Sequence, residues 1–231
     1  MAREHLVLGE GVEIADDVEI GANVVIHAGT RIGAGVRIGD GAVLGKQPSL
    51  GRKSTAKREP LPPLVVGDGA VISTNAVVYA GVEIGARAII GDLASVRERC
   101  TVGEETVVGR GVCVENDTVI GARCRIQSNS YVTAYCLLED DVFIAPCVTT
   151  TNDNFMGRTE RRHELIKGAT IRRGARVGGG ACLLPGIEIG EEAFIGAGAV
   201  VVRDAPARTV MVGVPARALR PVPEDELLPE A

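Results

Sequence analysis

The chain has 231 residues, of which 45% are hydrophobic and 24% charged, an ordinary composition for a globular protein and a length within reach of one domain. The net charge of −5 at pH 7 argues against nucleic acid or an anionic membrane surface as a partner. No apolar run approaches the ~18 residues of a membrane span and the start shows no signal-peptide pattern, so we expect a cytoplasmic protein. Only 3% of residues are aromatic, which predicts a core of small aliphatic side chains.

Aliphatic residues recur every six positions along almost the whole chain. The recurrence runs from Leu8 to Leu44, from Val66 to Thr150 and from Ile171 to Val201, and Thr150 alone among the twenty-eight positions is not Ile, Val or Leu. A period of six fits neither a helical face nor a heptad seam, and a short fixed period is typical of a stacked repeat fold. A second track of small residues, two positions before each aliphatic one, alternates with it as the inward residues of a strand do.

The repeat predicts an all-β chain of short strands, each ended by a turn. Glycine follows the aliphatic residue in many units, which suits a turn with unusual backbone angles or close packing of neighbouring backbone. Three strands per coil give a triangular parallel β-helix with about 18 residues per coil. Twenty-eight units then make about nine coils.

This hexapeptide pattern resembles that of the bacterial hexapeptide acyltransferases, over residues from about 8 to 218. The resemblance implies a left-handed parallel β-helix, a handedness that the period alone does not indicate because strand crossovers are ordinarily right-handed. We expect one β-helix domain over residues 1–218, followed by an acidic, mobile tail over 219–231.

Two segments, 45–65 and 151–170, break the six-residue phase and are expected to leave the prism as loops. Both are locally basic in an acidic protein; their basic residues are Lys46, Arg52, Lys53, Lys57 and Arg58 in the first, and Arg158, Arg161, Arg162 and Lys167 in the second. A solvated loop would explain either one alone. Two basic loops on one prism favour a polyanionic ligand.

The C-terminal units carry a more specific pattern. Gly196-Ala-Gly-Ala-Val-Val-Val-Arg-Asp204, followed by Val212-Gly-Val-Pro-Ala-Arg217, resembles the ending of acetyl-CoA-dependent hexapeptide transferases. The resemblance implies that acetyl-CoA lies in a groove between subunits of a homotrimer, with small residues along the pantetheine and basic residues near the phosphates, which suit a guanidinium fork. The residues implied are Gly179, Gly180, Ala181, Ala197 and Gly198 along the groove, and Arg203 and Arg217 near phosphate. Tight packing of coils also accounts for part of this small-residue pattern.

A second resemblance, to nucleotide-linked 3-amino-sugar N-acetyltransferases, rests on three stretches: Arg125-Ile-Gln-Ser-Asn129, Leu138-Glu-Asp-Asp-Val-Phe-Ile144 and Thr151-Asn-Asp153. It implies that Gln127 and Asn129 lie on one coil, with Glu139 and Asp140 near the equivalent place on a later one, 12 residues on. Asn152 and Asp153 are placed at the base of the second loop. The family often continues with Tyr-Pro-Arg, whereas this chain has Asn154-Phe-Met-Gly-Arg158, so the acceptor sugar stays open.

Acetyl transfer to an amine needs a deprotonated nucleophile, a donor to the developing oxyanion and a proton acceptor. The resemblance implies catalytic positions for Asn129, Asp140, Asn152 and Asp153, and substrate-binding positions for Gln127, Glu139, Arg158 and His163. Among them, Asn152 would position the amine, and Asp153 would orient the ammonium or accept a proton. An amine held beside a thioester already reacts fast, so a strong base is not required.

Several alternatives stay open or are disfavoured by residue types. His5, His27 and His163 are too scattered to supply the three ligands of a zinc hydratase on this fold, and no metal is expected. The six cysteines include no CxxC pair and indicate free thiols in a reducing compartment. An O-acetyltransferase acting on a sugar hydroxyl, a longer acyl donor or acyl carrier protein, and a non-catalytic β-helix scaffold remain as alternatives.

Overall fold

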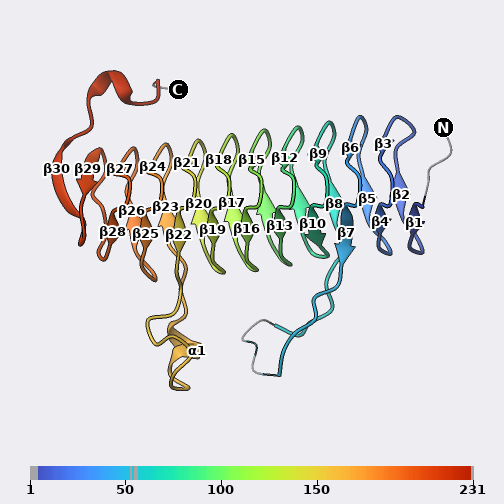
Figure 1. Cartoon of the computed structure of the whole chain (residues 1–231), viewed down its shortest axis with the longest axis horizontal. Coiled ribbons are helices and arrows are strands. Elements are labelled where there is room, and N and C mark those ends of the chain that lie inside the picture. The colour runs from blue at the N-terminus through green and yellow to red at the C-terminus, as the bar shows by residue number, and fades with distance from the viewer. Residues whose placement is uncertain (1–4, 53, 55–56, 230–231) are drawn as a thin grey trace.

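In the computed structural model, which describes residues 5–52, 54 and 57–229, the chain winds into a three-sided parallel β-helix (Figure 1). Each six-residue unit contributes one short strand, and successive units pass from one side of the prism to the next. The left-handed parallel β-helix predicted from the repeat is confirmed. Lys53, one of the basic residues expected in the first loop, lies outside the described residues.

Three sheets form the sides of the prism and are called faces 1, 2 and 3. Face 1 has ten strands: β1 (Val7–Leu8), β4 (Val25–Ile26), β7 (Val43–Lys46), β10 (Val77–Tyr79), β13 (Ser95–Val96), β16 (Cys113–Val114), β19 (Tyr131–Val132), β22 (Thr149–Thr150), β25 (Cys182–Leu183) and β28 (Val200–Val201). Face 2 has nine strands: β2 (Glu13–Ile14), β5 (Arg31–Ile32), β8 (Val65–Val66), β11 (Glu83–Ile84), β14 (Thr101–Val102), β17 (Val119–Ile120), β20 (Leu137–Leu138), β23 (Thr170–Ile171) and β26 (Glu188–Ile189). Face 3 has eleven strands: β3 (Glu19–Ile20), β6 (Arg37–Ile38), β9 (Val71–Ile72), β12 (Ile89–Ile90), β15 (Val107–Val108), β18 (Arg125–Ile126), β21 (Phe143–Ile144), β24 (Arg176–Val177), β27 (Phe194–Ile195), β29 (Thr209–Val212) and β30 (Arg217–Pro221).

The prism is longer than the nine coils expected. Face 3 gains β29, which pairs parallel to β27, and β30, which pairs antiparallel to β29. Both strands lie beyond Val201, where the six-residue period ends, so a count of repeats misses them. The chain after residue 218, expected to be a mobile tail, continues β30 and packs back on the prism, with Val222 buried.

The core is the stacked aliphatic ladder. Ile126 and Leu138 are fully buried, as are nearly all rungs away from the N-terminal end, and Cys100 and Cys124 of the second track lie among them. At Gly67, which directly follows a rung, a Cβ would lie 2.8 Å from the amide nitrogen of Ala86 in the next coil. Close approach of successive coils therefore explains that glycine.

Helical structure is confined to two short elements in the described chain, α1 (Arg162–Leu165) in the second loop and the 3-10 turn η1 (Glu224–Glu226) near the C-terminus. Neither these nor any other described segment forms a helix of the length and apolar character that a membrane crossing requires.

Candidate functional site

Both loops that break the repeat leave the prism from the same edge. Edge 1–2 comprises the corner residues between each face-1 strand and the following face-2 strand, and the first loop follows β7 while the second follows β22. The two loops project to the same side of the prism (Figure 1). Five strand steps on face 1 separate β7 from β22, which corresponds to about 24 Å at ~4.8 Å per step.

Between the loops, edge 1–2 carries a network of polar side chains that we call the edge cluster: Arg97, Glu98, Arg99, Glu115, Asn116 and Asp117. Glu98 is fully buried, and its carboxylate accepts hydrogen bonds from Arg97 Nε at 3.0 Å and Nη2 at 2.9 Å. One coil on, Arg99 donates to both oxygens of Asp117, at 2.8 and 2.9 Å. The cluster is a rigid, charge-paired surface because each carboxylate is held by a planar guanidinium.

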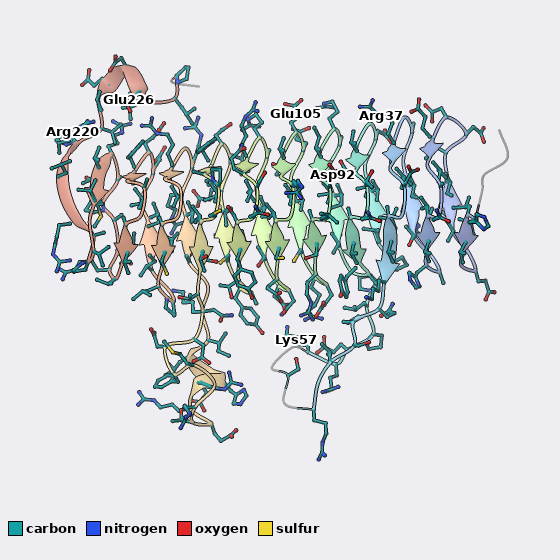
Figure 2. All side chains as sticks on the ribbon, viewed as in Figure 1. Arg37, Lys57, Asp92, Glu105, Arg220 and Glu226 are labelled. Carbon is teal, nitrogen blue, oxygen red and sulfur yellow. The ribbon has the colours of Figure 1, made fainter. Side chains whose placement is uncertain are left out.

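The edge cluster keeps unused donor capacity. Arg99 Nη1 is buried and has no hydrogen-bond partner in the described part of the chain. Although burial alone would raise the pKa of Asp117, hydrogen bonds from Arg99 and Asn116, and the charge of Lys57, hold that pKa below its usual value. Lys57 belongs to the first loop (Figure 2), so this loop brings positive charge towards the cluster. A ligand between the loops would meet donors and positive charge.

Asn152 and Asp153 lie at the base of the second loop, as expected. Asp153 Oδ1 accepts the Phe155 amide at 2.8 Å, and Oδ2 accepts the Gly157 amide at 2.9 Å and Arg162 at 3.0 Å. The Gly157 hydrogen bond, followed by those of Phe155 and Arg162, lowers the pKa of Asp153 against the opposing effect of desolvation. The carboxylate therefore organises the loop and is a weak proton acceptor.

The other two predicted substrate-binding residues of this loop are on its surface. Arg158 is exposed, and His163, in α1, is exposed with its Nε2 3.4 Å from a carboxylate oxygen of Glu160. Asn152 lies closer to the prism, where its amide donates to the carbonyl of Ala134 at 3.4 Å. The second loop thus holds Asn152 against edge 1–2 and carries Arg158 and His163 further out.

Gln127 and Asn129 do not share an edge with Glu139 and Asp140. The first pair follows β18 and lies on edge 3–1, between faces 3 and 1; the second pair follows β20 and lies on edge 2–3. The expectation of equivalent places 12 residues apart is wrong because one coil contains 18 residues, as the pairing of Val114 with Val132 shows. A separation of 12 is two faces.

On edge 2–3 the two carboxylates tie neighbouring coils together. Asp140 accepts the Ala122 amide at 2.8 Å and Arg123 at 3.2 Å, and Glu139 accepts Arg172 at 2.7 Å. Similar Asp-to-amide bonds join coils elsewhere, at Asp40, Asp68 and Asp92. The geometry of Glu139 and Asp140 is that of coil-to-coil braces.

Edge 3–1 gathers most of the residues expected to line a cofactor groove. Gly179 and Gly180 follow β24, and Ala197 and Gly198 follow β27 on the same edge as Gln127 and Asn129. A Cβ at Gly180 or Gly198 would meet no atom within 4 Å, so both positions border open space.

The remaining predicted cofactor residues lie elsewhere in the protomer. Ala181 is fully buried in the core. Arg203 is exposed on edge 1–2 after β28, and Arg217 is exposed at the start of β30, where it donates to the Ala216 carbonyl at 2.8 Å. The predicted site is therefore divided between edges 1–2 and 3–1, and both of these border face 1.

The edge cluster is absent from the residues selected by sequence. Its members were detectable, because Arg97-Glu-Arg99 and Glu115-Asn-Asp117 follow the face-1 rungs Val96 and Val114 and lie one coil apart. Counting rungs in threes assigns both stretches, and both loops, to one edge. No cluster of three or more His, Cys, Asp or Glu side chains suited to a metal ion occurs among the residues described.

Known sequence families match most of the chain. The bacterial transferase hexapeptide (six repeats) matches residues 6–46, the hexapeptide repeat of succinyl-transferase matches 166–203, and the GMPPB C-terminal domain matches 61–159. The chain belongs to the hexapeptide-repeat transferases.

Individual relatives of this hexapeptide-repeat transferase match over shorter stretches. The putative acetyltransferase YJL218W of Saccharomyces cerevisiae is 36% identical over 87 residues, which are 36% of this chain and 44% of the yeast protein. Serine acetyltransferase of Buchnera aphidicola is 40% identical over 62 residues, 27% of this chain and 23% of that enzyme. The chain thus spans less than half the length of these curated relatives.

Among solved structures, the UDP-N-acetylglucosamine acyltransferase LpxA of Bacteroides fragilis superimposes with a TM-score of 0.57. The match covers 91% of this chain and 73% of LpxA at 14% sequence identity. At that identity the likeness concerns the β-helix fold.

Proposed function

We propose that this protein is an acetyl-CoA-dependent N-acetyltransferase that acts on the amine of a nucleotide-linked amino sugar. The observation that supports it most is the position of the two basic loops, which flank the edge cluster on one edge of a hexapeptide-repeat prism. That arrangement offers positive charge and unused donors to a phosphorylated acceptor. The acetyltransferase relatives and the motif ending at Arg217 favour acetyl-CoA as the donor.

We infer that face 1 is the subunit interface of a homotrimer. The outward position that opens each described face-1 strand carries no charged residue; these residues are Val7, Val25, Val43, Val77, Ser95, Cys113, Tyr131, Thr149, Cys182 and Val200. The same position is charged several times on the other faces, for example at Glu83 and Arg31 on face 2 and at Arg37 and Arg176 on face 3. An uncharged side along the whole prism is suited to burial against copies of the chain.

A three-fold arrangement with face 1 towards the axis brings together the two halves of the predicted site. Each prism would then touch its neighbour through edge 1–2 on one side and edge 3–1 on the other, a heterologous contact that closes into a ring. The small-residue strip around Gly180 and Gly198 on one subunit would face Asn152 and the loops of the next. The thioester would lie along the strip and the amino sugar between the loops.

In this site the amine nitrogen attacks the thioester carbonyl, the C–S bond breaks, and CoA leaves as the thiol after taking a proton. The Asn152 amide can position the amine or donate to the oxyanion, and Gln127 and Asn129 lie on the strip side. Because the pKa of Asp153 is lowered, we assign it the task of holding the loop in place rather than that of accepting the proton. Proximity of amine and thioester supplies much of the rate.

The proposal is tested by measuring thiol release from acetyl-CoA with UDP- and dTDP-linked amino sugars as acceptors. We expect Asp153→Ala to lower kcat/KM about 10- to 100-fold, because displacing a positioned group by about 1 Å has effects of this size. The matched control is Asp68→Asn on edge 2–3, where Asp68 accepts the Ala34 amide at 2.9 Å far from the loops.

Full activity of Asp153→Ala with unchanged KM would remove Asp153 from the site. Turnover only with acceptors that lack a free amine would replace the proposal by O-acetylation. A trimer by light scattering without turnover on any acceptor would favour a scaffold, and a monomer at micromolar concentration would contradict the shared site.

A further inference from the structure

Arginine and phenylalanine alternate along the C-terminal half of face 3. Arg125, Phe143, Arg176 and Phe194 occupy the outward position of β18, β21, β24 and β27, and each lies opposite the next in the parallel register. Successive strands are ~4.8 Å apart, so each ring lies beside a guanidinium. The Arg176 guanidinium lies 5.1 Å from the centre of the Phe194 ring. We call these four residues the Arg-Phe column.

A hollow of about 500 Å³ opens over the column, with Arg125, Phe143 and Arg176 in its lining. This volume is within the range of small-molecule sites. Arg176 Nη1 donates to Glu226 at 3.0 Å, whereas its Nε and Nη2 are buried without a hydrogen-bond partner in the described chain. Buried donors without acceptors are uncommon and costly, so the side chain has capacity for a further anionic group.

The hollow is covered by the C-terminal strap, residues 222–229, which folds back over face 3 beyond β30; Glu226 lies in its 3-10 turn (Figure 2). Besides the buried Val222 and the Arg176–Glu226 pair, the strap is held by the Leu228 amide, which donates to Glu192 at 2.8 Å. Gly174, with φ +68°, makes room for it, since a Cβ there would lie 2.9 Å from Leu228 Cδ1.

The strap supplies the negative charge that the column faces. Elsewhere in the lining, Arg123 is paired with Asp141 at 2.7 Å and Glu105 with Arg87 at 2.9 Å, so these charges are already balanced. Lifting the strap would withdraw Glu226, together with the neighbouring acidic residues of η1, and leave Arg176 without its carboxylate. The hollow would then be open and more positive.

We propose that the hollow over the Arg-Phe column is a binding site for a nucleoside diphosphate, which the strap closes in cis by presenting Glu226 in place of a phosphate oxygen. Arg176 and Arg125 would hold the phosphates through their guanidinium forks, and Phe143 would stack on the base. Ligand and strap compete for Arg176, so occupancy of the site is coupled to release of residues 223–229. The site is separate from the two edges assigned to acetyl transfer.

The test uses the full chain and ADP, followed by isothermal titration calorimetry and by amide hydrogen exchange. We expect ADP to speed exchange in the strap and to slow it in β18, β21 and β24. Arg176→Gln should weaken ADP binding at this site about tenfold. Glu226→Gln should strengthen it about threefold because the competing carboxylate loses its charge. Arg37→Gln, an outward arginine on the same face at β6, is the matched control and should change neither quantity.

The two parts of the ligand are separated by adenosine and by pyrophosphate, each of which should bind more weakly than ADP. ADP that binds without altering strap exchange occupies another site and overturns the proposal. It is also overturned if Glu226→Gln leaves affinity unchanged, or if pyrophosphate matches ADP. The Glu226 variant changes one strap side chain only, so the test stands even where Arg176→Gln fails to fold.

Discussion

Replacing Thr150 by valine would complete the aliphatic ladder, yet we expect the variant to be less stable than the wild type. In a regular coil the carbonyl of the rung accepts an amide from the neighbouring coil, as Val132 does from Glu115 at 2.8 Å. At Thr150 the side chain takes over, because its Oγ1 accepts the Thr133 amide at 2.8 Å. The hydroxyl also lies 3.3 Å from the Tyr131 carbonyl, to which it donates.

The size of the effect follows from what valine leaves behind. Thr133 is only 4% exposed, so its amide would lose its acceptor without gaining water. An unsatisfied buried donor costs about 1–3 kcal/mol. Removing the buried hydroxyl returns part of this, about 0.5–2 kcal/mol on scales that allow partial hydrogen bonding. Since the hydroxyl of Thr150 is already hydrogen-bonded, we expect the cost to win, with a net loss of about 1 kcal/mol in the free energy of unfolding.

Chemical denaturation followed by circular dichroism, at matched protein concentration, measures this difference. Thr150→Ser keeps the hydroxyl and should cost only the lost methyl, about 1 kcal/mol or less. Val114→Thr, on a rung whose backbone ladder is regular, places a hydroxyl in the core and should destabilise. The reasoning is refuted if Thr150→Val is as stable as the wild type or more stable.

Two other features can be tested by thiol labelling and by a charge-neutralising substitution. A thiol reagent should modify the exposed Cys147 first and leave Cys100 unmodified at pH 8 until unfolding, because burial raises the pKa of Cys100 to about 12; native labelling of Cys100, detected by peptide mass spectrometry, would contradict this. Cys113 and Cys182, outward on face 1 and half-buried in the protomer, should be protected in the assembled protein and react after dissociation, and equal rates in both states would count against face 1 as the interface. Glu98→Gln should lower the free energy of unfolding by about 2–4 kcal/mol, because it removes the charge that two arginines share in a buried position; an unchanged denaturation midpoint would show that the ion pairs are dispensable.

The fold was predictable because the inward residues of a β-helix carry the strongest signal that a sequence can hold. Burial acts directly on each rung, so Ile, Val and Leu recur at every position except the one where a hydroxyl does the work of a carbonyl. Strands β29 and β30 escaped prediction for the same reason, since they extend face 3 without the six-residue spacing.

The site was less predictable because the residues on a coil's corners face in three directions. Spacing places Glu139 close to Gln127 in sequence, but which edge each occupies depends on the count of rungs in threes. The hydrogen bonds of Asp153 to its own loop were also hidden, since they depend on how residues 154–162 fold. Local motifs therefore identified loops and coils, while the division of the site between edges needed the structure.

The positions of the two loops along edge 1–2 give the protein a built-in ruler. Their separation is a whole number of coils, so it can change only in increments of ~4.8 Å, each requiring the gain or loss of a complete turn of chain. A partial turn would move one loop to another edge altogether. Adding one turn between β13 and β16 would lengthen the ruler by one increment while both loops kept their own sequences and the core kept its register. The span available to a ligand between the loops is in this sense counted rather than continuously adjustable.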